Sequence, residues 1–365
     1  MNPLALLDAS FLWAYGIVVL YYALRYWRHP HKTLKVRVSE LVYSALFFVN
    51  GTLVLFLFAG QGLGTAQENL LYLAMFACFA ATLSFLWGDV LYTRARVKRN
   101  PRLLDPEAWS SGKVPVRDFD EYFQALEAEY EAAGADRKDV KKDLSRKFLH
   151  LVILGVVVGF HEMAYWAEGW LADAGLTPLA ARNAAYYVAG YFFTFMFATA
   201  DVVRVYHFPY LPDWALKWYG ASVEVKTEKY SYISSVPFLL SITMLVLAPF
   251  PVILTAAVVS CISDGAASIV GKNFGRHKLG SFGCHPHKSW EGLFAGASSA
   301  FVGVFLVFVF YPQPGVTTAW QLLFGVAAAA AFVYSDCFAK YVVDNVLNTL
   351  VPALLVWIPL AFLAA

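Results

Sequence analysis

The sequence is poor in charged residues. Asp, Glu, Lys and Arg together make up 15% of its 365 residues, whereas a soluble domain usually carries about 25%. Apolar residues account for 59% of the chain. Most of the chain therefore does not face water, which excludes an ordinary soluble globular protein.

Cysteine is also scarce, and its spacing excludes two further classes. The four cysteines are scattered, without the paired spacing of a disulfide framework or a zinc ribbon. Residues 1–24 contain no Lys or Arg, so they lack the basic region of a secretory signal peptide. We interpret this stretch as a retained membrane span. With a net charge of only +2, no nucleic-acid partner is expected.

Long apolar runs are what the sequence has in abundance. A spanning helix needs about 20 mostly apolar residues. The stretches that qualify are 4–24, 39–60, 68–92, 148–164, 184–204, 230–249, 251–271, 290–311, 319–340 and 346–364. The sequence therefore predicts an all-α, polytopic integral membrane protein with about ten transmembrane helices.

The Lys and Arg residues fall in alternate connections between these runs. Of the 28 Lys and Arg residues, only Arg182 falls in the other set of connections. Basic residues accumulate on the cytoplasmic side of membrane proteins. We therefore expect the charge-rich side to be cytoplasmic and both termini to lie outside.

The one sizeable polar segment divides the chain into three regions. We expect an N-terminal three-span region (1–93), a cytoplasmic insertion (94–147) and a seven-span catalytic region (148–365). Within the insertion, Asp118 is suited to cap a helix whose apolar residues recur at helical spacing. This pattern predicts an amphipathic helix that lies on the membrane or covers the charge-rich side.

Ionisable residues at the ends of the predicted spans are functional candidates, because charges inside a membrane are costly. They are Asp89, Arg146, Lys147, His150, Asp201, Arg204, Asp264, Glu291, Asp336 and Asp344. Each alone is explained by a snorkelling base or a helix cap. Their recurrence at one level on so many spans predicts a shared polar site.

The stretch 263–292 is the richest in chemistry. Its small residues allow a helix end to approach a backbone or a ligand closely, and Gly271 and Gly275 allow a positive-φ turn with exposed amides. Such amides, with nearby Lys side chains, can hold phosphate. Asp264 and Glu291 suit Mg²⁺, which binds through one or two carboxylates plus phosphates. The pattern predicts a site for a metal-bound nucleoside triphosphate; the alternative is a small-residue helix-packing motif.

These residues also form a recognisable pattern. Asp264-x-x-Ala267-Ser268-x-x-Gly271-x-x-x-Gly275, followed by Lys288-Ser289-x-Glu291-Gly292, resembles the nucleotide-binding signature of the CTP-dependent lipid kinases. That family includes dolichol kinase, phytol kinase and CTP-dependent diacylglycerol kinase, and is distantly similar to phosphatidate cytidylyltransferases. Arg146-Lys147-x-x-His150, Asp201-x-x-Arg204 and Asp344-Asn345 before Pro352 resemble further family motifs. The resemblance covers about residues 144–360.

The resemblance implies a membrane-embedded kinase that transfers the γ-phosphate of CTP to the hydroxyl of a lipid alcohol. Asp264 would bind Mg²⁺, with Glu291 second, and Lys272 and Lys288 would hold phosphates. Arg146, Lys147 and Arg204 would stabilise transition-state charge, and Asp201 or His150 would accept the hydroxyl proton; a structural role for His150 is the alternative. The implied nucleotide contacts are Ser263, Gly265, Ala267, Ser268, Gly271, Lys272, Gly275, Ser289, Gly292, Asp344 and Asn345.

Other functions stay open at this point. A cytidylyltransferase that makes a CDP-lipid would use the same metal and phosphate ligands. A transporter is less favoured, because it would show repeats and charges near the bilayer midplane. The sequence leaves open the lipid, the choice between CTP and ATP, and the oligomeric state.

Overall fold

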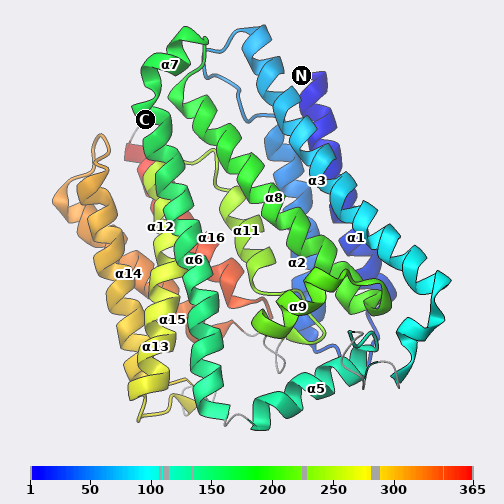
Figure 1. Cartoon of the computed structure of the whole chain (residues 1–365). Coiled ribbons are helices and arrows are strands. Elements are labelled where there is room, and N and C mark those ends of the chain that lie inside the picture. Colours follow the sequence, from blue (N-terminus) through cyan, green and yellow to red (C-terminus); the bar gives the residue numbers. More distant parts are fainter. Residues whose placement is uncertain are drawn as a thin grey trace.

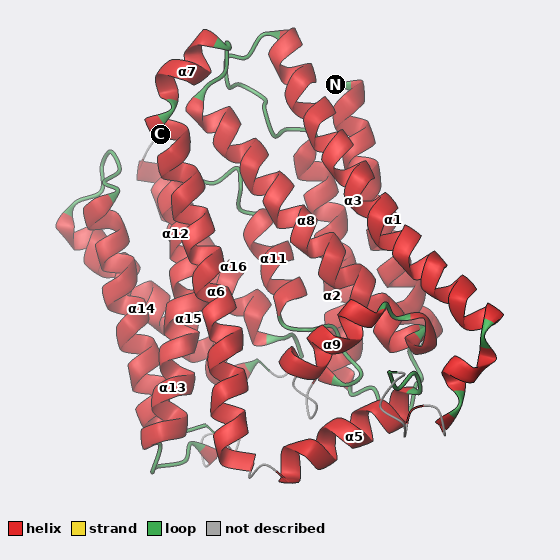
Figure 2. Ribbon diagram, in the orientation of Figure 1, coloured by secondary structure: helices red, strands yellow, loops and turns green. Residues whose placement is uncertain are grey.

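The computed structural model describes residues 2–106, 109, 115–132, 135–223, 228–280, 288–339 and 341–363. Within these ranges, side chains are described except at 129–132, 135–149 and 221–222. Helices dominate this part of the chain and no strand occurs in it (Figure 2). The expected all-α fold is confirmed.

Most of the helices run along a common direction between two ends of a bundle (Figure 1). The α-helices of the described residues are α1 (Pro3–Arg25), α2 (Leu34–Val54), α3 (Thr65–Arg99), α5 (Phe119–Ala132), α6 (Ala135–Trp166), α7 (Glu168–Asp173), α8 (Pro178–Tyr206), α9 (Asp213–Ser222), α11 (Ser235–Thr243), α12 (Phe250–Val258), α13 (Asp264–Phe274), α14 (Trp290–Phe310), α15 (Thr318–Phe338) and α16 (Asp344–Leu363). Short 3₁₀ turns η1 (Pro101–Leu104) and η2 (Phe208–Tyr210) follow α3 and α8. Helix α5 lies across one end, and both chain ends lie at the opposite end.

Seven helices in the described residues are long and apolar enough to cross a membrane. They are α1, α3, α8, α14, α15, α16 and the continuous helix Phe250–Phe274, which joins α12 and α13 through the π-helical turn η3 (Val259–Ser263). Such a set of helices is typical of a multi-pass membrane protein.

The ten predicted stretches do not all form long apolar helices. The expected span 230–249 is helical only over α11, whose nine residues extend about 14 Å and cannot cross about 30 Å of hydrocarbon. The prediction of one spanning helix there is wrong. The apolar part of α6, His150–Trp166, is shorter than the seven long helices.

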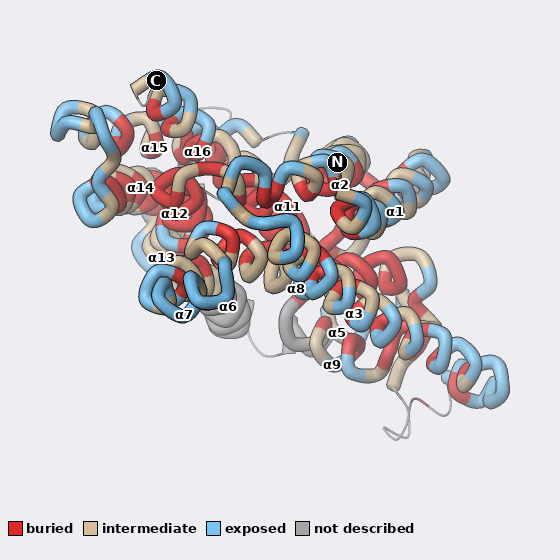
Figure 3. Tube along the Cα trace, turned by 90° about the horizontal axis from the view of Figure 1, so that it is seen from above, coloured by how far each residue is buried: buried red, intermediate tan, exposed pale blue. Residues whose placement is uncertain are grey.

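The outer surface of the bundle is apolar. Phe85, Phe294 and Phe362 are 69%, 63% and 80% exposed, while buried residues lie between the helices (Figure 3). In water, apolar faces of this kind would drive association. Such faces are typical of a surface that lies against lipid, which agrees with the long apolar helices and the low charge content of the sequence.

The insertion contains the predicted amphipathic helix. The Asp118 carboxylate accepts hydrogen bonds from the backbone N–H groups of Asp120 and Glu121 at 2.9 and 3.0 Å, which caps α5. Phe119 and Phe123 pack against Phe208 of η2. The predicted region boundaries at 93/94 and 147/148 fall inside α3 and α6, so continuous helices join the three regions.

A glycine contact sets how closely α13 and α14 approach. A Cβ atom added to Gly292 would lie 2.7 Å from the carbonyl oxygen of Ala267 and 3.0 Å from the Cα of Gly271. Real Cβ atoms do not approach backbone so closely, and backbone cannot swing away as a side chain can. The absence of a side chain at Gly292 is therefore a condition of this helix crossing.

Gly292→Ala is expected to lower the stability of the protein by about 1–3 kcal/mol, because the methyl group overpacks the crossing. The measurement is thermal unfolding of the purified protein in detergent. Gly155→Ala in α6 is the matched control, because a Cβ there meets nothing within 4 Å; it should be neutral or stabilising. Equal melting temperatures for the two variants would contradict this account of the crossing.

Candidate functional site

Lys288 and Asp336 form an ion pair at the end of the bundle that α5 crosses. Lys288 lies just before α14, and its Nζ donates hydrogen bonds to the carboxylate of Asp336 and, at 2.7 Å, to the Asp336 carbonyl oxygen. Asp336, near the end of α15, is 9% exposed. The pair therefore joins the start of one helix to the end of the next.

Two further carboxylates act on Lys288. Burial lowers the pKa of Lys288, but the negative charges of Asp336, Asp344 and Asp264 raise it more, so that the net pKa lies above its ordinary value. The ammonium group is therefore held in its charged form. We call Asp264, Lys288, Asp336 and Asp344 the Lys288 cluster; its members come from four segments of the chain.

Asp264 enters this cluster directly after a π-helical turn. The turn η3 ends at Ser263, and Asp264 is the first residue of α13. Ser263 is fully buried, and its hydroxyl makes no hydrogen bond within the described part of the chain. π-Helical turns are uncommon in proteins, but those that occur are often found at functional sites. The turn precedes Asp264, which is also the first residue of the sequence motif.

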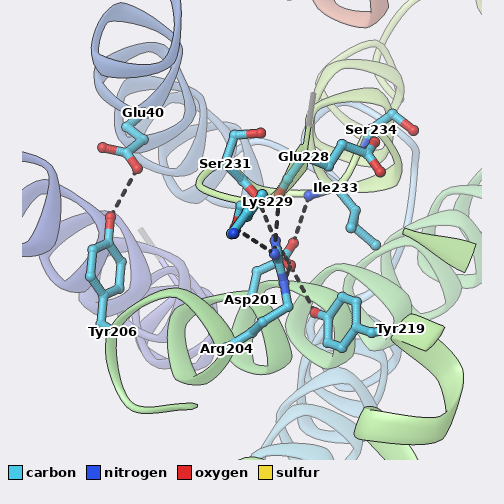
Figure 4. A network of polar contacts seen from close by, with 10 residues as sticks. All are labelled: Glu40, Asp201, Arg204, Tyr206, Tyr219, Glu228, Lys229, Ser231, Ile233 and Ser234. Atoms are coloured by element: carbon cyan, nitrogen blue, oxygen red, sulfur yellow. Dashed lines mark hydrogen bonds and ion pairs between the residues drawn. The ribbon is translucent and has the colours of Figure 1, made fainter. Parts of the chain in front are cut away.

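Asp201 and Arg204 form a second, fully buried pair (Figure 4). The Asp201 carboxylate accepts hydrogen bonds from Arg204 at 2.9 and 3.1 Å and from the Tyr219 hydroxyl at 2.7 Å. Arg204 also donates to the carbonyl oxygens of Glu228, Lys229 and Ser231 at 3.0, 3.0 and 2.5 Å. Both side chains are 0% exposed. The pair thus holds the loop after α9 in place, and the catalytic roles predicted for it stay predictions.

The loop that Arg204 holds links the Asp201–Arg204 pair to the Lys288 cluster. The Ile233 N–H donates to Asp201 at 2.9 Å, and the next residue, Ser234, accepts a hydrogen bond at 3.1 Å from the side chain of Asn345. Asn345 directly follows Asp344 of the Lys288 cluster. Asp344 and Asn345 are therefore tied to α8 through two hydrogen bonds.

Glu291, the second predicted magnesium ligand, faces His277. Its carboxylate accepts hydrogen bonds from the His277 backbone N–H at 3.2 and 3.3 Å and lies 2.7 Å from His277 Nδ1. No group of three or more His, Cys, Asp or Glu residues that could hold a metal ion occurs in the described residues. Mg²⁺ needs only one or two carboxylates when phosphates supply other ligands. The magnesium-binding role of Asp264 and Glu291 therefore stays a prediction.

The glycines of the motif differ from what their sequence suggested. Gly271 lies inside α13, Gly275 follows its end with φ −69°, and neither has positive φ. The Gly275 N–H donates to the Gly271 carbonyl at 3.1 Å, so it is not an exposed amide. A Cβ on Gly275 would lie 2.5 Å from Ser289 Oγ. The predicted positive-φ turn is wrong, and these glycines allow close packing of α13 against the start of α14.

The remaining predicted residues are scattered over the same end of the bundle. Lys272 is exposed in the last turn of α13, and Gly265, Ala267 and Ser268 are buried or half-buried in that helix. His150 is 4% exposed, with its ring 5.2 Å from that of Phe238. The side chains of Arg146 and Lys147 lie outside the described residues.

Comparison with protein-family models, curated proteins and solved structures found no match to this chain. The resemblance to CTP-dependent lipid kinases therefore depends on the sequence motifs. Two contacts had no signal in the sequence: the pairing of Lys288 with Asp336, and that of Glu291 with His277. Asp336 itself had one signal, its position as a carboxylate at the end of a predicted span.

Arg204→Met is expected to destabilise the protein by about 3–5 kcal/mol, because it leaves the Asp201 carboxylate buried without its ion partner. Thermal unfolding in detergent measures the loss, and adding Asp201→Asn should recover part of it. Arg94→Met is the control, because Arg94 is exposed over the Tyr210 ring and should change stability by less than about 0.5 kcal/mol. A melting temperature for Arg204→Met equal to that of the wild type would show that the pair does not hold the loop.

Proposed function

We propose that this protein is a membrane-embedded kinase that transfers the γ-phosphoryl group of CTP to the hydroxyl of a lipid alcohol at the Lys288 cluster. The observation that carries the proposal is the ion pair of half-buried Lys288 with Asp336 at an end of the bundle, in the negative field of Asp264 and Asp344. The choice of phosphoryl transfer as the reaction and of CTP as the nucleotide comes from the resemblance of the sequence motifs to those of CTP-dependent lipid kinases.

The chemistry of phosphoryl transfer matches these groups. The reaction needs positioning and neutralisation of phosphate charge more than covalent help from the protein. Lys288, kept protonated by its carboxylate neighbours, supplies a fixed positive charge for the β- and γ-phosphates. Asp264 would hold Mg²⁺, with Glu291 as the predicted second carboxylate, and the ion neutralises phosphate charge when bound. Exchange of Asp336 for phosphate as the partner of Lys288 would accompany nucleotide binding.

The position of the cluster suits an acceptor that stays in the bilayer. The apolar outer faces of the bundle keep a hydrocarbon chain in contact with lipid, and the hydroxyl need only reach the end of the bundle. Asp201 is poorly placed to accept the hydroxyl proton, because both its oxygens are buried and hydrogen-bonded. His150 stays the other candidate.

Lys288→Met is expected to lower the transfer of ³²P from [γ-³²P]CTP to a lipid alcohol by about 100-fold or more, as for removal of a charge that stabilises the transition state. The assay uses the full chain in lipid nanodiscs with a panel of polyprenols, phytol and diacylglycerol, and [γ-³²P]ATP in parallel. Lys278→Met is the matched control, since Lys278 is exposed in the same loop, and should keep its activity.

The released nucleotide distinguishes the kinase from its closest alternative. CDP is the expected product. Pyrophosphate would instead indicate a cytidylyltransferase that makes a CDP-lipid and would refute the kinase proposal. Unchanged activity of Lys288→Met, with a normal melting temperature, would show that the Lys288 cluster is not the site.

We also propose that the Lys288 end faces the cytoplasm, because the basic connections gather there. Arg276→Cys, at an exposed position just after the end of α13, is introduced into a variant without the natural cysteines. A membrane-impermeant maleimide should label inside-out vesicles and leave intact cells unlabelled. Labelling of intact cells would invert the orientation.

A further inference from the structure

A cavity of about 790 Å³ lies at the end of the bundle opposite the Lys288 cluster. It is formed where α6 and α14 end and where α8 and α12 begin, and Arg182 is in its wall. Its volume is within the usual range for small-molecule sites, about 300–1,000 Å³. Arg182 is also the one basic residue that stands apart from the charge-rich side in the sequence.

Arg182 is buried among neutral groups. It is 3% exposed. Its Nε and Nη2 donate to the Asn183 side-chain oxygen at 3.1 and 2.8 Å, and Nη2 donates to the Val246 carbonyl at 3.4 Å. Its guanidinium carbon lies 5.7 Å from the centre of the Tyr186 ring. Within the described part of the chain, no carboxylate pairs with Arg182, and Nη1 makes no hydrogen bond.

A buried guanidinium without a counter-charge is unusual. Arg keeps its proton in proteins, so it cannot escape the cost of burial by becoming neutral, and buried charges are normally paired. By contrast, Arg204 at the other end of α8 has Asp201. Two helices begin at the cavity and two end there, so their dipoles offset one another and Arg182 supplies the positive charge of the wall. The wall therefore favours an anion.

The mouth of the cavity suits an anion that carries an apolar chain. Phe56, Tyr165 and Phe310 belong to the lining and are 57%, 47% and 72% exposed. Exposed aromatic residues at the end of a membrane bundle lie at the level of lipid head groups. A small soluble anion would gain nothing from these rings, whereas a lipid would pack its chain against them.

We propose that this cavity binds the anionic head group of a membrane lipid, with a phosphate or carboxylate on Arg182 and the acyl chain along Phe56 and Phe310. The site lies at the far end of the bundle from the Lys288 cluster, so it does not depend on the kinase proposal. It would account for the buried charge, because the lipid supplies the partner that the chain lacks.

The test compares lipid binding by the wild-type protein, Arg182→Gln and two further variants. The full chain, stripped in an uncharged detergent, is titrated with phosphatidylglycerol or phosphatidylcholine, and bound lipid is counted by native mass spectrometry alongside thermal unfolding. Phosphatidylglycerol should bind the wild type and raise its melting temperature more than phosphatidylcholine does. Arg182→Gln should weaken phosphatidylglycerol binding about 10- to 100-fold, as expected for loss of a hydrogen bond to a charged group.

Two variants keep the test decisive if Arg182→Gln folds poorly. Ala59→Trp fills the cavity mouth from an exposed position and should also weaken phosphatidylglycerol binding. Arg25→Gln is the matched control: Arg25 lies over the Tyr21 ring at the other end of the bundle and should bind like the wild type. Equal binding of the two lipids by the wild type, or undiminished phosphatidylglycerol binding by Ala59→Trp, would refute the proposal. Inorganic phosphate that stabilises the wild type as strongly as phosphatidylglycerol would refute a lipid as the occupant.

Discussion

A charge inside a bilayer has no water to pair with, and its partner must come from the protein or from a ligand. This constraint organises the charge-rich end of the bundle. Arg204 pairs with Asp201 and donates hydrogen bonds to three backbone carbonyls, which fixes the loop from Glu228 to Ser231. Lys288 pairs with Asp336. The first pair is closed to solvent and builds the end of the bundle, while the second is only half-buried and keeps its chemistry accessible.

The same constraint explains where the sequence was informative and where it was not. Apolar run length predicted the helical membrane fold, because each run needs only itself to form a helix. The run 230–249 is the exception. The backbone groups of Ser231 and Ile233 hydrogen-bond to Arg204 and Asp201, which lie more than 25 positions away in the sequence. The helix therefore begins only at Ser235. A hydropathy pattern carries no information on such distant partners.

The sequence predicted which residues belong to the Lys288 cluster, but not which of them contact each other. Asp264, Asp336 and Asp344 were visible as charges at the ends of predicted spans, and Lys288 was visible through the sequence motif. Which of them touch depends on how the helices cross, and the crossing of α13 and α14 depends on Gly292. Sequence spacing alone does not distinguish a glycine that permits positive φ from one that permits close packing, and at Gly271 and Gly275 it suggested the wrong one.

The π-helical turn at Val259–Ser263 sets the rotation of α13 about its own axis. A π turn contains one residue more than the α-helical turn it replaces, and one residue corresponds to about 100° of rotation around a helix. The face that α13 turns towards Lys288 is thus set by a single inserted residue upstream. Removing one residue from the turn would rotate α13 by about that angle and turn the Asp264 carboxylate away from its present direction.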